Sequence, residues 1–267
     1  IDYKEYTISQ KLYLILGEEI NQIDKKNHEN INIPVEKGVK IPCSTQYEDL
    51  TNLHYIILDR KVNTVLEFGI GKSSKIIVDA LKINKIRHHE YVSQNLRKDN
   101  LFECHTVDDD NYWINDFRKN LNEDLSDYLK LYFSKLSMTE FCGRICTLYD
   151  SLPNINPDLI YIDGPGQYSP IGEVRGINTS HKDRTPMAAD ILSIEHFLHP
   201  GTLIVFDGRT ANARFLKTNL QRDWAYFYSN SWDQHFFELQ EEPLGKYNKL
   251  YLDHCLGNAF FERMNRK

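Results

Sequence analysis

The sequence contains no run of 18 or more apolar residues, the length that a membrane-spanning helix needs, so we expect no transmembrane segment. It also lacks a surplus of basic residues, since 32 Lys and Arg stand against 38 Asp and Glu, a net charge of −6. Nucleic-acid binding depends on a basic surface, so this balance argues against a nucleic-acid partner. The first residues lack the basic start and apolar middle of a secretory signal, which favours a cytoplasmic protein.

Cysteine is scarce and odd in number, with five residues scattered along 267 positions. Cys142 and Cys146 lie four residues apart, but no second pair completes a zinc site. We therefore expect reduced, buried thiols, as in other cytoplasmic proteins. Internal repeats and low-complexity tracts are also missing, and the length suits one α/β domain with an added cap.

What the sequence does contain is a regular alternation of strand-like and helix-like segments. The predicted strands are 62–68, 101–107, 144–149, 159–162 and 202–206, and the predicted helices are 73–81, 112–121, 125–136 and 187–198. Segments 224–229 and 236–239 alternate like antiparallel strands, and 249–253 is a candidate third. The pattern predicts an α/β fold with a mixed seven-stranded sheet, mainly parallel with an antiparallel edge, and helices on both faces. In such sheets, ligands bind outside the carboxyl ends of the strands.

The N-terminal part, residues 1–50, is predicted to be a helical segment that caps the main domain at 51–267. Near-helical spacing of apolar residues predicts a helix over 3–24, followed by a polar connector over 24–38. Thr45 and Glu48 have the spacing of a capping box, which predicts a helix from there to about Leu58.

The first chemical motif is residues 67–73 (EFGIGKS), which follow a strand and open a helix. Glycines there let the backbone turn tightly and approach a ligand, and the helix N-terminus offers free amides. The motif lacks the third glycine of the dinucleotide pattern and the spacing of a P-loop. Glu67, two positions before Gly69, would repel a pyrophosphate but can hold the ammonium of an amino-acid ligand.

With this motif the chain resembles the class I S-adenosylmethionine-dependent methyltransferases, which are Rossmann-like. The resemblance implies that Glu67, Gly69 and Gly71 line the methionine part of the cofactor S-adenosylmethionine and that Ser73 starts the next helix. A plain turn between a strand and a helix is the alternative.

A carboxylate after the second predicted strand is expected to bind the cofactor ribose. Asp108 fits this place by resemblance, because a carboxylate accepts two hydroxyl hydrogen bonds at once. The gap from Gly71 is about twice the roughly 20 residues usual in dinucleotide folds. Either residues 84–100 are an insertion, or Glu90 binds the ribose instead. An acidic helix start explains the Asp run equally well.

Three further strand ends complete the resemblance. Residues 149–151 end the third predicted strand, where the family places the adenine, so the adenine candidates are Tyr149, Asp150 and Ser151. Residues 157–165 (PDLIYIDGP) and 201–209 (GTLIVFDGR) resemble strands four and five of the small-molecule O-methyltransferase branch. Asp163 and Asp207 are thus expected at the carboxyl edge, as cofactor-binding and catalytic candidates. The histidine that often follows the fourth-strand motif is missing here.

Metal-dependent relatives hold a divalent ion with acidic residues after strands four and five and a neighbouring Asn, and the ion activates the acceptor hydroxyl. The candidates here are Asp163, Asp207 and Asn212, and the ion would be magnesium. Arg209 intrudes on this group, so an Asp–Arg pair that orients the acceptor is the favoured alternative. Without metal, His181 is the candidate general base, because it titrates near neutrality.

The loop at 166–184 is predicted to receive the acceptor, through Gln167, Tyr168, Arg175 and Arg184, together with Arg209. Guanidinium groups there suit a phosphate- or carboxylate-bearing acceptor. The expected reaction is O-methylation of a small polar metabolite or sugar, and one form of this hypothesis has a phosphorylated or nucleotide-linked acceptor. A homodimer is one hypothesis for the oligomeric state. The rival hypotheses are a non-catalytic binding module with the same fold and a dinucleotide-dependent oxidoreductase.

Overall fold

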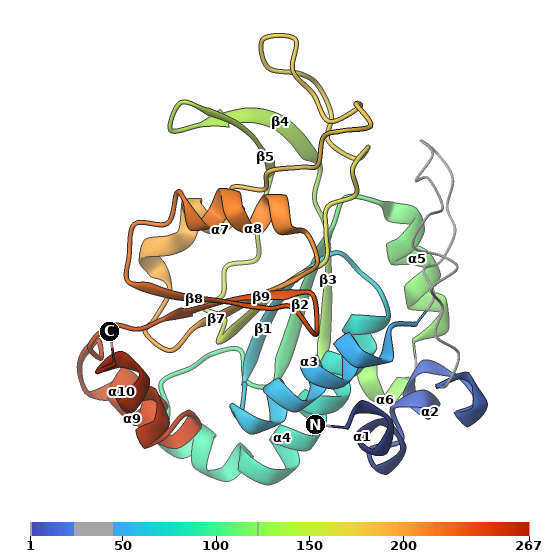
Figure 1. Ribbon diagram of the computed structural model, residues 1–267. Coiled ribbons are helices and arrows are strands. Elements are labelled where there is room, and N and C mark those ends of the chain that lie inside the picture. The colour runs from blue at the N-terminus through green and yellow to red at the C-terminus, as the bar shows by residue number, and fades with distance from the viewer. Residues whose placement is uncertain (1, 24–44, 122, 267) are drawn as a thin grey trace.

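A seven-stranded sheet forms the centre of the computed structural model, which describes residues 2–23, 45–121 and 123–266 (Figure 1). The strand order is β3-β2-β1-β6-β7-β9-β8. The strands are β1 Thr64–Phe68, β2 Glu103–Asp108, β3 Leu129–Phe133, β6 Leu159–Ile162, β7 Leu203–Asp207, β8 Trp224–Ser229 and β9 Gln234–Leu239. The first five in the sheet order are mutually parallel, whereas β9 is antiparallel to both of its neighbours. The predicted fold class is confirmed.

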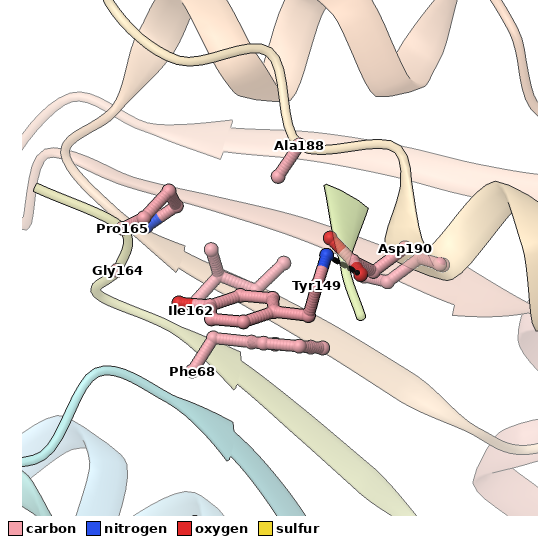
Figure 2. A pocket seen from close by; sticks show the side chains of 8 residues that line it. Phe68, Tyr149, Ile162, Gly164, Pro165, Ala188 and Asp190 are labelled. Carbon is pink, nitrogen blue, oxygen red and sulfur yellow. Dashed lines mark hydrogen bonds between the residues drawn. The ribbon is translucent and has the colours of Figure 1, made fainter. Parts of the chain in front are cut away.

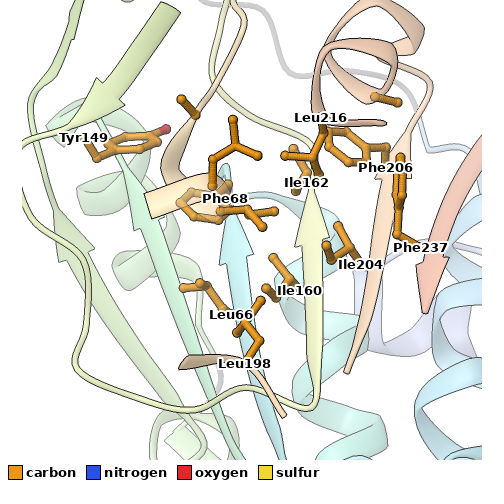
Figure 3. Close-up of a cluster of buried hydrophobic side chains, with 14 of the residues drawn as sticks. Leu66, Phe68, Tyr149, Ile160, Ile162, Leu198, Ile204, Phe206, Leu216 and Phe237 are labelled. Carbon is orange, nitrogen blue, oxygen red and sulfur yellow. The ribbon is translucent and has the colours of Figure 1, made fainter. Parts of the chain in front are cut away.

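Helices cover both faces of this sheet and explain why its central strands are mainly apolar. On one face, α3 (Tyr47–Asp59) and α4 (Lys72–Asn95) pack on side chains such as Val65 and Leu159. On the other face, α7 (Asp190–Ile194) and α8 (Thr210–Lys217) pack on Leu66, Ile160 and Ile204, the layer drawn in Figure 3. Strands buried on both faces have mainly apolar sequences, as β6 (LIYI) does and as β1 (TVLEF) does apart from the buried Thr64 and Glu67. Among the described helices, none combines the length and apolarity needed to cross a membrane.

The main domain also contains α5 (Asn111–Asn120), α6 (Glu123–Ser126), α9 (Gly245–Cys255) and α10 (Asn258–Met264). Two predictions in these regions were wrong. The predicted helix over 125–136 is a short α6 followed by β3, because Leu129, Leu131 and Phe133 alternate along an edge strand that pairs with β2. The candidate strand 249–253 lies inside α9, whose buried positions 248, 251, 252 and 255 repeat with helical spacing.

The predicted strand 144–149 is present as β5 (Arg144–Tyr149), but it lies outside the main sheet. It forms a two-stranded hairpin with β4 (Leu136–Phe141). Figure 1 shows this hairpin beyond the carboxyl ends of the parallel strands. The predicted helix 187–198 is shorter than expected, with α7 followed by the 3₁₀ turn η3 (Glu195–Phe197).

The N-terminal segment is helical, although the helix predicted over 3–24 is divided. Its parts are α1 (Tyr3–Ser9), α2 (Leu12–Leu16) and the 3₁₀ turn η1 (Ile20–Gln22), with a break at Lys11, where φ is 55°. The predicted connector at 24–38 lies almost wholly outside the described residues. The predicted capping box was wrong: α3 begins at Tyr47 with no side-chain cap, and the Thr45 hydroxyl bonds to Glu18 instead.

Candidate functional site

The loop after β1 and the loop after β6 meet where the strand order reverses direction. After β1 the chain continues to β2 and β3 on one side, and after β6 it continues to β7 on the other, although β1 and β6 are paired neighbours. Ligands of open α/β sheets bind at such a switch point, outside the carboxyl ends of the strands. Gly69, with φ of 95°, lies against Gly164, and a Cβ on Gly69 would be 2.9 Å from the Gly164 nitrogen. The two glycines therefore let the loops contact each other through their backbones.

The amides of the first loop are already bound inside the protein. Gly69 N–H donates to the Val107 carbonyl at 3.0 Å, and Ile70 N–H donates to Asp108 Oδ2 at 2.9 Å. Gly71 is the N-cap of α4, and its N–H donates to Ser74 Oγ at 3.2 Å. A Cβ on Gly71 would meet nothing nearer than a side-chain oxygen 3.9 Å away. The fold thus requires glycine at 69, whereas at 71 the missing side chain leaves open space beside the helix N-terminus.

Glu67 lies beneath this loop and has no exposed surface. Its carboxylate accepts the hydroxyl of Ser73 at 2.7 Å and those of Ser74 and Thr106 at 2.6 Å each. Burial raises the pKa of Glu67 to about 7, although the hydroxyl donors lower it. From the sequence we expect this carboxylate to hold a ligand ammonium. In the structure it instead accepts hydrogen bonds from three hydroxyl groups of α4 and β2. Ser74, which was not among the predicted residues, directly follows Ser73 in the motif.

Asp108 ends β2 beside the same loop and is 8% exposed. In addition to the Ile70 N–H, it accepts the Asp110 N–H at Oδ1, 2.7 Å away. Burial raises the pKa of Asp108 to about 6, and the two amide bonds oppose the rise. A carboxylate has about four acceptor positions, so two remain for ligand hydroxyls.

Glu90, the alternative to Asp108, lies far from this site. It is an exposed residue of α4, 18 positions beyond Lys72, or about 27 Å along the helix at about 1.5 Å per residue. The long gap between the motifs arises because α4 continues to Asn95, well past the predicted end at residue 81.

Asp163 and Asp207 stand at the ends of β6 and β7 with Arg209 between them. The Arg209 guanidinium donates to the carbonyl oxygens of Pro165, at 2.7 Å, and of Asp163, and it lies 3.7 Å from Asp163 Oδ1. The protein packed around the Asp163 carboxyl raises its pKa, the Arg209 charge opposes the rise, and Asp207 adds to it, although half of the side-chain surface stays exposed to solvent. Asp207 accepts the hydroxyl of the buried Tyr161 at 2.9 Å. An Asp–Arg pair is therefore present at the place where the sequence suggested one.

The third metal candidate, Asn212, is buried in α8, and its side-chain oxygen has no hydrogen-bond partner. Among the described residues there is no group of three or more His, Cys, Asp or Glu side chains that could hold a metal ion. The metal site stays a prediction.

Helix α3 adds a carboxylate that sequence reasoning missed. Burial and the nearby Asp207 carboxylate raise the pKa of Asp49 to about 8. One helical turn later, Asn52 donates to Gln234 on β9 at 2.5 Å, which fixes α3 against the carboxyl edge of the sheet. Asp49 lies before β1 in a segment without a motif, so only the packing of α3 brings it to the site.

A narrow apolar pocket opens beside the two loops (Figure 2). Tyr149 stacks on Phe68 with ring centroids 5.6 Å apart, and the buried Tyr149 hydroxyl has no hydrogen-bond partner. Asp190, 2% exposed, accepts the Tyr149 N–H at 3.0 Å, while its second oxygen is unpartnered. Burial raises the pKa of Asp190 to about 7. The lining of the pocket thus contains two buried polar atoms without partners, the Tyr149 hydroxyl and one Asp190 oxygen. Asp190 was not among the predicted residues.

The other adenine candidates lie beside the end of β3. Asp150 N–H donates to the Lys135 carbonyl at 2.9 Å, and Ser151 N–H donates to Ser134 Oγ at 2.9 Å. These bonds bring the end of β5 back to the main sheet, so that Tyr149, Asp150 and Ser151 stand near the site even though β5 does not belong to the sheet.

Apart from Arg209, the predicted acceptor residues lie in the outer loop, where Gln167 contacts His181. His181 has a 57% exposed side chain 3.9 Å from Asp183, and Gln167 donates to the His181 carbonyl at 2.7 Å. Arg184 donates to the Asn178 carbonyl at 3.2 Å. Arg175 is exposed and Tyr168 is half-buried. Hydrogen bonds join this loop to β4, as between Met138 and Ile171 at 2.8 Å, so the loop and the hairpin form one outer layer.

The solved structures to which this chain is similar include methyltransferases. They include the SAH-bound methyltransferase PaMTH1 of Podospora anserina, with TM-score 0.42 and 14% identity over 74% of this chain and 80% of that one. The O-methyltransferase from Bacillus cereus in complex with SAH has TM-score 0.42 and 12% identity, over 88% and 98% of the two chains. The O-methyltransferase TomG from Streptomyces achromogenes, in complex with SAM, has TM-score 0.38 and 12% identity, over 73% and 81%. No family model and no curated protein matches the sequence.

The structure brings together five groups of residues at one edge of the sheet. They are the glycine loop, Asp108, the Asp163–Arg209–Asp207 group, the Tyr149 pocket and Asp49. Among the predicted residues of the outer loop, Gln167, His181 and Arg184 have their described side-chain hydrogen bonds and ion pairs within that loop.

Proposed function

We propose that this chain is an S-adenosylmethionine-dependent methyltransferase, and the observation that carries the proposal is the charge of the site. Glu67, Asp108 and Asp163 surround a glycine loop at the start of a helix. Within the described part of the chain, the cations beside that loop are Lys72 and Arg209, and each is paired with a carboxylate: Lys72 lies 2.9 Å from Glu18, and Arg209 lies 3.7 Å from Asp163 Oδ1. Such a site repels a pyrophosphate and favours a ligand with positive charge. S-adenosylmethionine carries an ammonium and a sulfonium as well as a ribose diol.

The residues at the site match the parts of this cofactor. The two free acceptor positions of Asp108 suit the ribose hydroxyls. The side chain of Asp163, 50% exposed, is available to the ammonium, and the first-turn amides of α4 suit the carboxylate. We assign the adenine edge to Asp190 and the Tyr149 hydroxyl, because each has a polar atom without a hydrogen-bond partner. Gly69 and Gly71 keep the loop thin enough for this approach.

When bound, the cofactor supplies an activated methyl group, so the chain has mainly to position the acceptor in line with it. We propose that the acceptor is a hydroxyl group of a small polar metabolite or sugar. Asp49 and Asp207 lie together on the α3 side of the site, and burial raises the pKa of both carboxyls. A carboxylate with a pKa near neutrality is suited to take the hydroxyl proton as a general base. This carboxylate pair replaces His181 as our preferred base.

The charge of the site also bears on the choice of acceptor. Arg175 and Arg184, which suggested a phosphorylated acceptor, belong to the outer loop, whereas carboxylates dominate at the sheet edge. We therefore favour a neutral or amine-bearing hydroxyl compound over a phosphorylated one.

Isothermal titration calorimetry with S-adenosylmethionine, S-adenosylhomocysteine and NAD tests the cofactor. We expect the first two to bind and NAD not to bind; no binding of either sulfur ligand by the wild type would overturn the proposal. An acceptor screen with and without EDTA would follow. Cofactor binding without transfer to any acceptor would favour the non-catalytic binding module.

A further inference from the structure

The hydroxyl cluster beneath the glycine loop has an unusual composition for a buried charge. Within the described residues, the partners of Glu67 are the hydroxyls of Ser73, Ser74 and Thr106 and, at 4.0 Å, the Cys104 thiol, with no cation among them. All of these groups are 2% exposed or less. Buried charges are usually paired with an opposite charge or bound to a metal, so an unpaired carboxylate here calls for a reason other than stability.

The three hydroxyls come from two elements, α4 and β2, whose relative position shapes the proposed ligand site. Ser73 and Ser74 belong to the first turn of α4, and Thr106 belongs to β2, two residues before Asp108. Ser74 Oγ donates to Glu67 and at the same time accepts the N–H of Gly71. The direction of the Ser74 hydroxyl is thus fixed, and with it the position of the loop amide.

A carboxylate suits the centre of this cluster better than a carboxamide does. Its two oxygens can accept from all three hydroxyls at once, whereas a carboxamide has one acceptor oxygen, and its NH₂ group would require at least one hydroxyl to accept instead. In its ionised form the carboxylate also binds each hydroxyl more strongly, because hydrogen bonds to an ionised acceptor are stronger than neutral ones.

From this geometry we infer that Glu67 is a positioning residue for cofactor binding. It holds the first turn of α4 and the end of β2 at the distance that the cofactor requires, and it does so without touching the cofactor. The inference rests on the proposed function, and it replaces the direct contact with an ammonium that the sequence suggested.

The test compares Glu67→Gln and Thr106→Val with the wild type by calorimetry, using S-adenosylhomocysteine and 5′-methylthioadenosine, which lacks the amino-acid part. Both variants keep the shape of the side chain, and circular dichroism would verify their folding. Glu103→Gln, at the far end of β2, is the matched control and should bind as the wild type does. We expect Glu67→Gln to weaken both ligands by a similar factor, about tenfold, and Thr106→Val to weaken both by a smaller factor.

Each outcome has a distinct meaning. If Glu67→Gln weakens S-adenosylhomocysteine alone and Thr106→Val has no effect, the carboxylate binds the ammonium directly and the inference is wrong. If both variants lose thermal stability but bind with unchanged affinity, their role is structural only, which also overturns it. If the wild type binds neither ligand, the proposed function itself fails.

Discussion

Replacing Gly69 or Gly71 by alanine should separate the stability of the fold from the binding of its ligand. The two residues are two positions apart in one loop, and each change adds a single methyl group. At Gly69, where φ is 95°, the new Cβ would be 2.9 Å from the Gly164 nitrogen and 3.1 Å from two further backbone atoms. At Gly71, φ is −174° and the nearest atom is 3.9 Å away. The clash at Gly69 is with backbone, which cannot rotate aside.

The expected magnitudes follow from these contacts. For Gly69→Ala, the positive φ costs about 1–2 kcal/mol and the forced backbone shift a further 1–3 kcal/mol or so, a loss of roughly 2–5 kcal/mol. In a chain of this size that corresponds to a fall in Tm of roughly 5–15 °C. For Gly71→Ala the loss should stay below about 1 kcal/mol, the cost of alanine in place of glycine at a helix N-cap. Its methyl group instead enters the space beside the α4 N-terminus, where we propose that the cofactor lies.

Thermal melts and calorimetry with S-adenosylhomocysteine, run on both variants and the wild type, check the prediction. Gly69→Ala should show the large drop in Tm, whereas Gly71→Ala should melt near the wild type and lose at least about tenfold in affinity, which is about 1.4 kcal/mol. Gly164→Ala, whose Cβ would be 2.9 Å from the Gly69 nitrogen, should resemble Gly69→Ala. Equal losses of stability in the Gly69 and Gly71 variants, or full affinity in Gly71→Ala, would refute the reasoning.

Three further predictions concern the carboxylates. Because burial raises the pKa of Asp190 to about 7, its contribution to stability is complete below its unfolded pKa of about 4 and is lost as the pH rises through 7. Urea denaturation of the ligand-free protein should therefore show a fall in stability from pH 5 to pH 8 that is smaller in Asp190→Asn; equal slopes would contradict this. In Asp108→Asn, the side chain keeps one acceptor oxygen, but its NH₂ group replaces the oxygen that accepts the backbone N–H of Ile70 or of Asp110. The affinity for S-adenosylhomocysteine, measured by calorimetry, should therefore fall at least about tenfold. EDTA should leave methyl transfer unchanged, because the Arg209 guanidinium stands beside Asp163; loss of activity that Mg²⁺ restores would show a metal requirement.

The positions and the mainly parallel arrangement of the central strands could be predicted from the sequence because burial on both faces leaves a mainly apolar run. The segments 62–68, 159–162 and 202–206 have that pattern, and the structure places β1, β6 and β7 there side by side. Strands at the edge of the sheet and outside it lack this apolar pattern. The residues of β3 fit an amphipathic helix as well as a strand, and only the pairing of β3 with β2 makes the strand the more stable form.

The site could be predicted in part, because strand ends are visible in the sequence and side-chain directions are not. Asp108, Asp163 and Asp207 follow strands and do gather at the carboxyl edge. Asp49 and Asp190 come from helices, and their approach depends on how α3 and α7 pack. Glu67 shows the remaining difficulty, since its spacing from Gly69 is the same whether its carboxylate faces a ligand or the hydroxyls beneath the loop.

The packing of Gly69 on Gly164 explains why two sequence motifs that are nearly a hundred residues apart occur together. A glycine loop after β1 could exist with any residue after Asp163, provided that the loops stayed apart. In this chain the two loops are in contact. Asp163 N–H donates to the Phe68 carbonyl at 3.0 Å, and the Arg209 guanidinium donates to the carbonyls of Asp163 and Pro165. The two loops are therefore one structural unit, in which a change at either glycine moves Asp163 relative to the start of α4. Since we assign these two features to the ammonium and the carboxylate of one ligand, their relative position should govern its affinity more than either does alone.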